Sequence, residues 1–402
     1  MYFKLQQHNY KLFPHDIQLK LSNTIPDAII SKSFHRYLSK MKEQINFNID
    51  KWTHTKIYTN PYEYIHTQYD DKMYLSKLNP VSRSFYKLIE ICKMLDLTQH
   101  ITPQCTSLHL AEGPGGFIQA MIRLKSNTSN PHKLQENNAY GNIIGVTLQS
   151  LCDSVPNWNK LKSVLPKQHN IVFDNLQDNS GDLYKPENIV YACQKYKNSM
   201  EFITADGGFD FSNNYKLQEH KMVKLLLFQC FYAILCQKKN GIFIMKIFDV
   251  FIQSTIDIIY LLNMFYENVY ICKLDTSRPA NSEKYIVCKG FLYSKVDTYY
   301  SFVYRAFEKM LTPCKTPTNI FRFLTMPVSN LFITKIEEYN AIFGQQQIEN
   351  IHQTIMLIEN KHNQEKIDQM IKSNVQKSIQ WCTKYQIPYN ILLTQIDEPI
   401  FK

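Results

Sequence analysis

A chain of 402 residues of which 44% are apolar can bury a large core, which excludes global disorder and allows one large domain or two. The formal net charge of +10 favours a polyanionic partner. The ten cysteines are scattered, and no two have the two-residue spacing of a zinc or redox motif, so we expect no metal site. The apolar runs are too short for a membrane span or a signal peptide. Together these features predict a soluble intracellular protein.

The predicted elements begin after a long irregular stretch. Residues 1–79 have no strand–helix rhythm, apart from a helix expected over 34–46. A helix over 82–95 then opens a regular alternation. Strands are expected at 106–112, 142–148, 171–176, 200–206 and 241–248, with helices over 117–125, 217–238 and 254–266. Two adjacent strands, 268–274 and 284–292, close this part of the chain.

Buried strands that alternate with helices predict an α/β fold with a parallel, Rossmann-like sheet. The closing pair departs from strict alternation, as a strand inserted antiparallel at one edge of the sheet would. Two prolines in 311–319 indicate a connector. Beyond it, Ile351, Ile355 and Ile358 recur at helical spacing, which is typical of core packing. We therefore predict an N-terminal extension (1–79), a sheet domain (80–300) and a mainly helical C-terminal region (301–402).

A glycine-rich turn lies between the first strand and its helix. It reads Glu112-Gly113-Pro114-Gly115-Gly116-Phe117. Glycines let a backbone approach a ligand closely, and a helix N-terminus offers unpaired amides. The spacing is neither that of a dinucleotide fold nor that of a Walker loop. The turn therefore predicts a site for a nucleotide-like cofactor, with a tight turn that binds nothing as the alternative.

Four ionisable residues fall at positions where charge is unusual. Asp206 closes a buried strand, Lys246 lies within an apolar strand, and Glu283 opens the last strand. Lys87 falls beside the apolar face of the helix over 82–95. Taken singly, each has a structural explanation, such as an ion pair, a snorkelling lysine or a solvated strand start. If the strands are parallel, however, Asp206 and Lys246 end neighbouring strands on the side of the glycine turn.

Seven segments in order over 80–295 resemble the FtsJ-like (RrmJ-type) RNA ribose methyltransferases, and most of all the eukaryotic and viral mRNA cap 2′-O-methyltransferases. They read SRSFYK, LHLAEGPGGF, GVTLQS, SGDLYKPENI, TADGGFD, FIMKIF and SRPANSEKYIV. The resemblance implies that S-adenosylmethionine is the cofactor and that the catalytic residues are Lys87, Asp206, Lys246 and Glu283. It implies a cofactor site made by Glu112, Gly113, Pro114, Gly115, Gly116, Phe117, Thr147, Asp182 and Asp206.

In this scheme Lys246 is the central residue and removes the proton of the ribose hydroxyl as that oxygen attacks the methyl group. A lysine can act as a base only if its pKa is lowered, by burial or by a nearby cation such as Lys87. Asp206 and Glu283 would orient the ammonium groups and offset their charge. Many methyltransferases hold the cofactor ribose with an acidic residue after the second strand. Here Thr147 and Gln149 stand at that place.

The resemblance leaves more than one function open. The leading hypothesis is methylation near the 5′ cap of mRNA, with capping or transcription proteins as expected partners and no membrane. The alternatives are ribosomal or transfer RNA as substrate, a non-catalytic RNA-binding or scaffold subunit, and a small-molecule methyltransferase. The expected location is the cytoplasm, including a viral factory or virion, or the nucleus. A large DNA virus would fit the abundance of Asn, Ile, Lys and Tyr.

Overall fold

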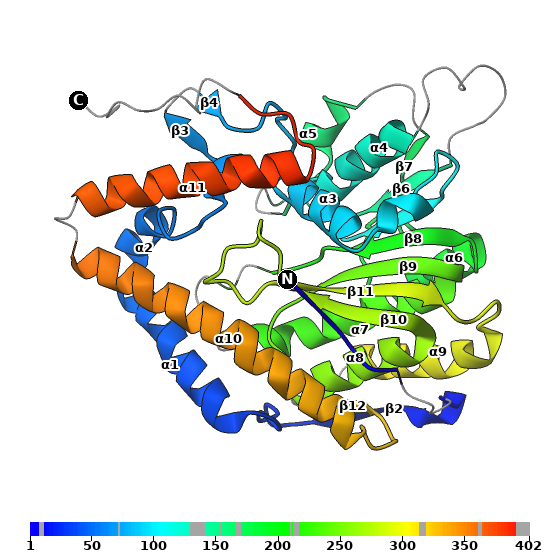
Figure 1. The fold of residues 1–402 in the computed structure, drawn as a ribbon. Coiled ribbons are helices and arrows are strands. Elements are labelled where there is room, and N and C mark those ends of the chain that lie inside the picture. Colours follow the sequence, from blue (N-terminus) through cyan, green and yellow to red (C-terminus); the bar gives the residue numbers. More distant parts are fainter. Residues whose placement is uncertain are drawn as a thin grey trace, which may run out of the picture.

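The fold is that of a computed structural model, drawn in Figure 1, and it describes most of the chain. The described residues are 1–7, 12–70, 73–128, 141–150, 152, 155–165, 170–209, 211, 217–312, 319–360 and 364–390. Five parallel strands form the centre: β5 (Ser107–Leu110), β6 (Ile143–Val146), β7 (Ile171–Phe173), β8 (Met200–Ala205) and β9 (Gln237–Ile247). Their apolar runs are expected because helices cover both faces of the sheet.

Two layers of helices enclose this sheet. On one face lie α3 (Ser84–Met94) and α4 (Gly116–Thr128). On the other lie α6 (Pro186–Tyr196), α7 (Gln218–Cys236) and α8 (Gln253–Phe265). Successive residues of β9 enter the two cores in turn, Ile242 and Ile244 on one face and Phe243 and Met245 on the other, as a period of two requires. The predicted Rossmann-like α/β fold is therefore confirmed.

Three further strands extend the sheet beyond β9. They are β11 (Lys284–Phe291), β10 (Tyr266–Cys272) and β1 (Tyr2–Lys4), and the full order is β1-β10-β11-β9-β8-β5-β6-β7. β11 runs antiparallel to both β9 and β10, which confirms the insertion. Its predicted place at the edge was wrong, because β10 and then β1 lie outside it. A strand of three residues such as β1 is too short to show an alternating pattern.

The N-terminal segment is more regular than the sequence predicted. It contributes β2 (Ile17–Ser22), α1 (Lys32–Phe47), α2 (Ile49–Thr55), the short pair β3 (Gln68–Asp70) and β4 (Met73–Tyr74), and the 3₁₀ turns η1 (Pro14–Asp16) and η2 (Glu63–Ile65). α1 confirms the one helix expected there. The isolated pattern of the other elements is weak, because β3 and β4 are very short and pair only with each other, whereas β2 and α2 have their partners elsewhere in the chain.

The C-terminal region supplies those partners. It contains α9 (Asp297–Leu311), β12 (Asn319–Leu324), α10 (Asn330–Glu359) and α11 (Gln364–Lys384). β12 pairs with β2, and α10 lies beside α1 (Figure 1). Ile351, Ile355 and Ile358 pack with α1 and α2, so the isoleucine stripe is core, as predicted. Most of the predicted connector, residues 313–318, lies outside the described residues, and the division at 79 and 300 stays a proposal.

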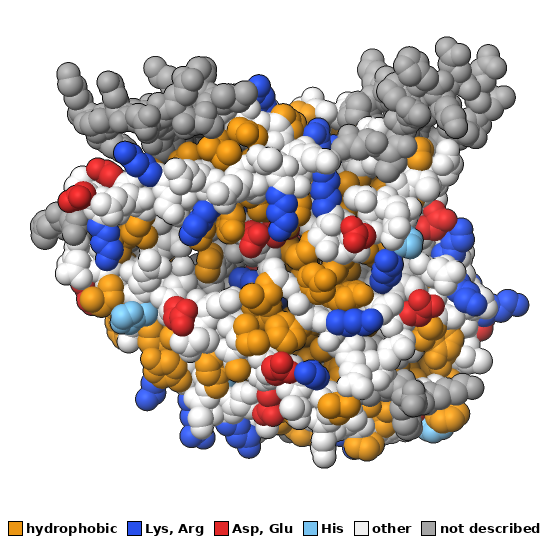
Figure 2. Space-filling model, in the orientation of Figure 1, with side chains coloured by type: hydrophobic (Ala, Val, Ile, Leu, Met, Phe, Trp, Pro, Cys, Tyr) orange, Lys and Arg blue, Asp and Glu red, His pale blue; other side chains and the backbone are white. Residues whose placement is uncertain are grey.

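The surface offers no simple reading of the charge. On the face drawn in Figure 2, lysine and arginine side chains are scattered among acidic and hydrophobic ones. In the described part of the chain, no helix combines the length and the apolarity needed to cross a membrane. The positions of the buried charged residues therefore say more about function than the net charge does.

Candidate functional site

The glycine turn after β5 forms one wall of a cavity. The Gly113 N–H donates a hydrogen bond to Oγ1 of Thr147 at 3.1 Å. A Cβ on Gly113 would lie 2.5 Å from the Pro156 carbonyl oxygen and 2.8 Å from that same hydroxyl. Gly115 has a φ of +108°, which side chains disfavour. Glycine is therefore required at position 113 by the close approach of Pro156 and Thr147, and at position 115 by its backbone conformation.

Three other residues of the predicted turn lie behind this wall. Glu112 is buried, and its Oε1 accepts the Phe117 N–H at 2.6 Å, at the start of α4. Burial raises the pKa of Glu112 well above its ordinary value. Gly116 faces Ser82 and Ser84, which come just before and at the start of α3. Glu112, Gly116 and Phe117 therefore support the turn from behind, whereas Gly113 and Pro114 line the cavity.

The cavity has a volume of about 980 Å³ and passes from the glycine turn to the N- and C-terminal helices. The residues at its two ends come from different parts of the chain. One end is lined by Gly113, Pro114, Thr147, Leu148, Gly181, Asp182, Leu183 and Tyr184. The opposite end is lined by Ile45, Trp52, Lys56, Asn60, Gln347 and Asn350. Among the described residues, no group of His, Cys, Asp or Glu is arranged to hold a metal ion.

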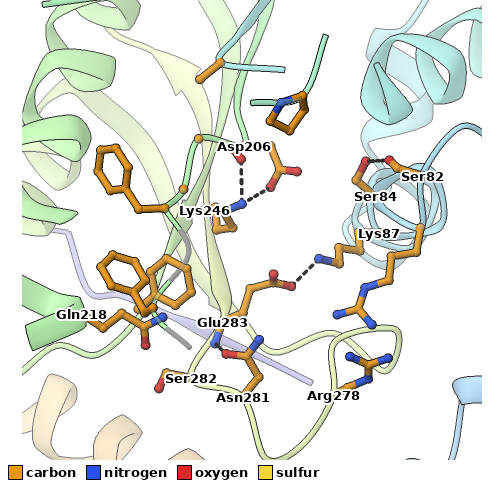
Figure 3. Close-up of a pocket in the computed structure, with 18 of the residues that line it drawn as sticks. Ser82, Ser84, Lys87, Asp206, Gln218, Lys246, Arg278, Asn281, Ser282 and Glu283 are labelled. Carbon is orange, nitrogen blue, oxygen red and sulfur yellow. Dashed lines mark hydrogen bonds and ion pairs between the residues drawn. The ribbon is translucent and has the colours of Figure 1, made fainter. Parts of the chain in front are cut away.

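The four predicted catalytic residues meet between these two ends as two ion pairs (Figure 3). The Lys246 ammonium lies 3.2 Å from Oδ1 of Asp206 and donates to the Asp206 carbonyl oxygen at 2.6 Å. The Lys87 ammonium lies 2.6 Å from Oε1 of Glu283. All four side chains are at most 15% exposed. The structure thus brings together residues separated by nearly 200 positions.

The strand pattern explains why these side chains converge. Ile242 and Ile244 of β9 enter the core beneath α3 and α4, so Lys246 points to the same face. Asp206 follows the carboxyl end of β8, the parallel neighbour of β9. β11 is antiparallel, so its start meets the end of β9 and brings Glu283 to this edge. Lys87 then reaches Glu283 from α3, which covers that face.

The electrostatics differ from the sequence-based expectation. Burial alone would lower the pKa of Lys246, but the carboxylates of Asp206 and Glu283 more than offset it, so the pKa is raised. Lys87 is the lysine whose pKa is lowered, by burial first and also by the positive charge of Arg83. Burial opposes the ionised form of Glu283, yet Lys87 and Lys246 hold its pKa below the ordinary value. Lys246 is therefore protonated in this state of the protein.

Two residues that the sequence analysis missed hold the carboxylates. The Tyr285 hydroxyl donates to Oδ1 of Asp206 at 2.8 Å, and Tyr285 pairs with Lys246 in the sheet register. The Ser277 hydroxyl donates to Oε1 of Glu283 at 2.5 Å. Period-two spacing could have revealed Tyr285, because it follows Glu283 by two residues and shares its face. No local pattern marks Ser277.

The loop before β11 is anchored by Glu90, which lies on α3. Glu90 accepts the backbone N–H groups of Asp275 and Thr276, the Thr276 hydroxyl and the indole N–H of Trp381 on α11. Lys273, on the same loop, donates to the carbonyl oxygens of Arg278, Asn281 and Glu283. The loop that carries Glu283 therefore depends on buried groups outside the cavity.

Glu90→Ala should destabilise the protein by about 3 kcal/mol or more, because several buried donors lose their acceptor at once. Urea unfolding would measure this loss. Glu359→Ala, on an exposed residue at the end of α10, is the matched control and should change stability by no more than about 0.5 kcal/mol. Equal stability of the two variants would show that Glu90 does not anchor the loop.

Comparison with known proteins now bears on this geometry. The family model described as FtsJ-like methyltransferase matches residues 80–291, which include the glycine turn and both ion pairs. The chain belongs to the FtsJ-like methyltransferase family. S-adenosylmethionine is the cofactor that this family indicates. The glycine turn fits it, since Gly113 and Pro114 line the cavity and Gly113 presents no side chain to it.

Several relatives of this FtsJ-like protein carry similar names. The chain is 31% identical over 229 residues to "Cap-specific mRNA (nucleoside-2′-O-)-methyltransferase 1" of Dictyostelium discoideum, covering 53% of this chain and 30% of that protein. It is 40% identical over 119 residues to the Homo sapiens protein of the same name, covering 28% and 14%. It is 24% identical over 291 residues to "Cap-specific mRNA (nucleoside-2′-O-)-methyltransferase 2" of Drosophila melanogaster, covering 66% and 39%. The chain thus spans well under half the length of each of these relatives.

Proposed function

We propose that this protein transfers a methyl group from S-adenosylmethionine to a ribose 2′-hydroxyl of RNA, at a nucleotide near the mRNA 5′ cap. The observation that carries the proposal is the Lys246 ammonium. It is held by Asp206 at the centre of a cavity that begins at the glycine turn. The names of the relatives favour the cap over other RNA positions.

We propose roles for the cavity residues on the cofactor side. Gly113 and Pro114 would hold the methionine part of the cofactor, while Thr147 and Asp182 would lie along its nucleoside part. All four line the same end of the cavity. When bound there, S-adenosylmethionine supplies a methyl group on a sulfonium whose positive charge opposes the protonated form of a nearby lysine.

The two ion pairs would divide the remaining work. Lys246 would accept the 2′-hydroxyl proton, and Asp206 would fix the direction of its amine. Tyr285 would hold the Asp206 carboxylate by donating its hydroxyl hydrogen to Oδ1, the same oxygen that lies beside the Lys246 ammonium. The positive charge of Lys87 would oppose that of Lys246, while Glu283 would offset the charge of both lysines.

The rate should increase with pH if Lys246 is the base. Only the neutral amine accepts a proton, and the raised pKa of Lys246 makes that form scarce at neutral pH. We expect kcat/KM, which reports the free enzyme, to rise about tenfold per pH unit between about pH 6 and pH 9. Steady-state rates with capped RNA across this range would test it. A flat profile would contradict the assignment.

The flanking helices support an RNA end as the substrate. The end of the cavity away from the glycine turn is walled by α1, α2 and α10, which suits a terminal group better than a continuous strand. We further expect the protein to act inside the cell, in the cytoplasm or nucleus, beside the capping or transcription machinery that produces such ends.

One assay tests the proposed function directly. The full chain is incubated with labelled S-adenosylmethionine and with RNAs of one sequence that carry an m7G cap, an unmethylated cap or a 5′ triphosphate. Nuclease mapping then locates the label. We expect label on a ribose next to the cap. Label on internal nucleotides irrespective of the cap would overturn cap specificity, and no transfer to any RNA with intact cofactor binding would overturn the activity.

A further inference from the structure

Six cationic side chains line the cavity, and four of them have a carboxylate partner. Lys87 and Lys246 form the pairs described above, and Lys42 lies 2.5 Å from Oδ2 of Asp249. Arg278 donates from Nε and Nη2 to the two carboxylate oxygens of Glu63. The remaining two cations are Lys56 and Arg83. Neither side chain forms an ion pair or hydrogen bond within the described residues.

The two unpaired cations belong to the same part of the cavity as Arg278. Lys56 follows α2, Arg83 directly precedes α3, and Arg278 lies in the loop before β11, on the same side of the cavity as Lys87 (Figure 3). Burial lowers the pKa of Lys56, and the positive charges of Arg278 and Arg83 lower it further. These three cations therefore repel one another, and two carboxylates offset part of their charge: Glu63 pairs with Arg278, and Glu283 interacts electrostatically with Arg83.

Repulsion of this kind is relieved when an anion binds. Arg278 uses Nε and Nη2 to bind Glu63, which leaves Nη1 available as a donor. Lys56, Arg83 and Arg278 therefore offer one ligand donors from three parts of the chain. A single phosphodiester carries one negative charge, whereas at least two negative charges are needed to neutralise the two unpaired cations. Linked phosphates supply that charge within a short length.

We propose that Lys56, Arg83 and Arg278 form a subsite for the linked phosphates at an RNA 5′ end, next to the ribose that is methylated. This inference rests on the proposed function and adds to it the group that the protein recognises. Lys56 lies outside residues 80–291, so the subsite would be completed by the N-terminal segment. Such a subsite would place the target ribose at a set distance from the 5′ end.

The test uses the full chain and short RNAs of one sequence with a cap, a 5′ triphosphate or a 5′ hydroxyl, in a fluorescence binding assay at fixed salt. We expect the RNAs with linked phosphates to bind about tenfold more tightly than the hydroxyl RNA. Lys56→Gln should remove most of that preference and lower the salt dependence of triphosphate RNA binding by about one charge. Its affinity for hydroxyl RNA should change much less.

Lys51→Gln is the matched control, because Lys51 is an exposed lysine of α2 that does not line the cavity. It should keep the preference. Arg83→Gln is a second variant from another element and should act as Lys56→Gln does. Equal binding of all three RNAs, or an unchanged preference in both cavity variants, would overturn the subsite.

The failure of the subsite and the failure of the proposed function can be told apart. Ribose methylation without any preference for linked phosphates would overturn the subsite and leave the activity standing. A preference that depends on Lys56, in a protein that transfers no methyl group, would overturn the activity and leave the subsite standing. A cap RNA that binds more tightly than triphosphate RNA would identify the cap as the source of the phosphates.

Discussion

Replacement of Lys246 by alanine should lower methyl transfer by about 10²–10⁴-fold, the usual contribution of a positioned general base. Lys246→Arg should be similarly inactive, because a guanidinium keeps the positive charge beside Asp206 but does not lose its proton. Cofactor binding should remain in both variants, since Lys246 is held by Asp206 rather than by the glycine turn. Single-turnover transfer to capped RNA and calorimetric binding of the cofactor would measure the two effects.

The control for this result lies on the same strand. Lys238 is an exposed residue of β9 that pairs with Glu201 far from the cavity, so Lys238→Ala should transfer methyl groups at the normal rate. Activity of Lys246→Arg near the wild-type level would show that Lys246 acts by its charge. The assignment of the base would then be wrong, although Lys246 would still belong to the site.

Replacement of Glu283 by glutamine should destabilise the protein by about 3–5 kcal/mol, because it leaves the buried Lys87 ammonium without its counter-charge. Chemical unfolding would measure the loss. Glu338→Gln breaks the exposed pair of Glu338 with Lys335 on α10 and should cost no more than about 1 kcal/mol. A loss for Glu283→Gln as small as that of the control would contradict the buried ion pair.

A double variant separates the stability effect from the catalytic one. Lys87→Met combined with Glu283→Gln removes both charges and should recover most of the lost stability, since a buried ion pair can be replaced by an apolar residue at little cost. Its methyl transfer should stay low, because both groups are proposed to act on the environment of Lys246. A stable double variant with normal activity would remove this pair from the catalytic machinery.

The N-terminal segment and the C-terminal region both contact the loop that carries Glu283. The N-terminal segment supplies Glu63 to Arg278 and Lys42 to Ser282, and the C-terminal region supplies Gln347 to the Ala280 carbonyl oxygen. These contacts hold the loop that leads to Glu283. The sheet domain and its flanks therefore share one cavity, although the family match covers residues 80–291 alone.

Local sequence was sufficient for the features that depend on short-range order. Patterns of a few residues predict the strand–helix alternation, the glycine turn and the position of Asp206 at a strand end. These patterns follow from the period-two strand and from the freedom of glycine. Such patterns predicted the fold class and marked Asp206 and Lys246 as unusual, whereas the resemblance to the FtsJ-like methyltransferases was needed to single out Lys87, Asp206, Lys246 and Glu283 as a set.

The interactions among these residues follow from the three-dimensional arrangement of distant segments. Which lysine has the lowered pKa depends on carboxylates from distant strands, and here it is Lys87 rather than Lys246. The place of β11 inside the sheet depends on its pairing with β9 on one side and with β10 on the other. The cations of the proposed phosphate subsite come from segments with no shared motif. Charge and register act through space, so residues far apart in the chain set them.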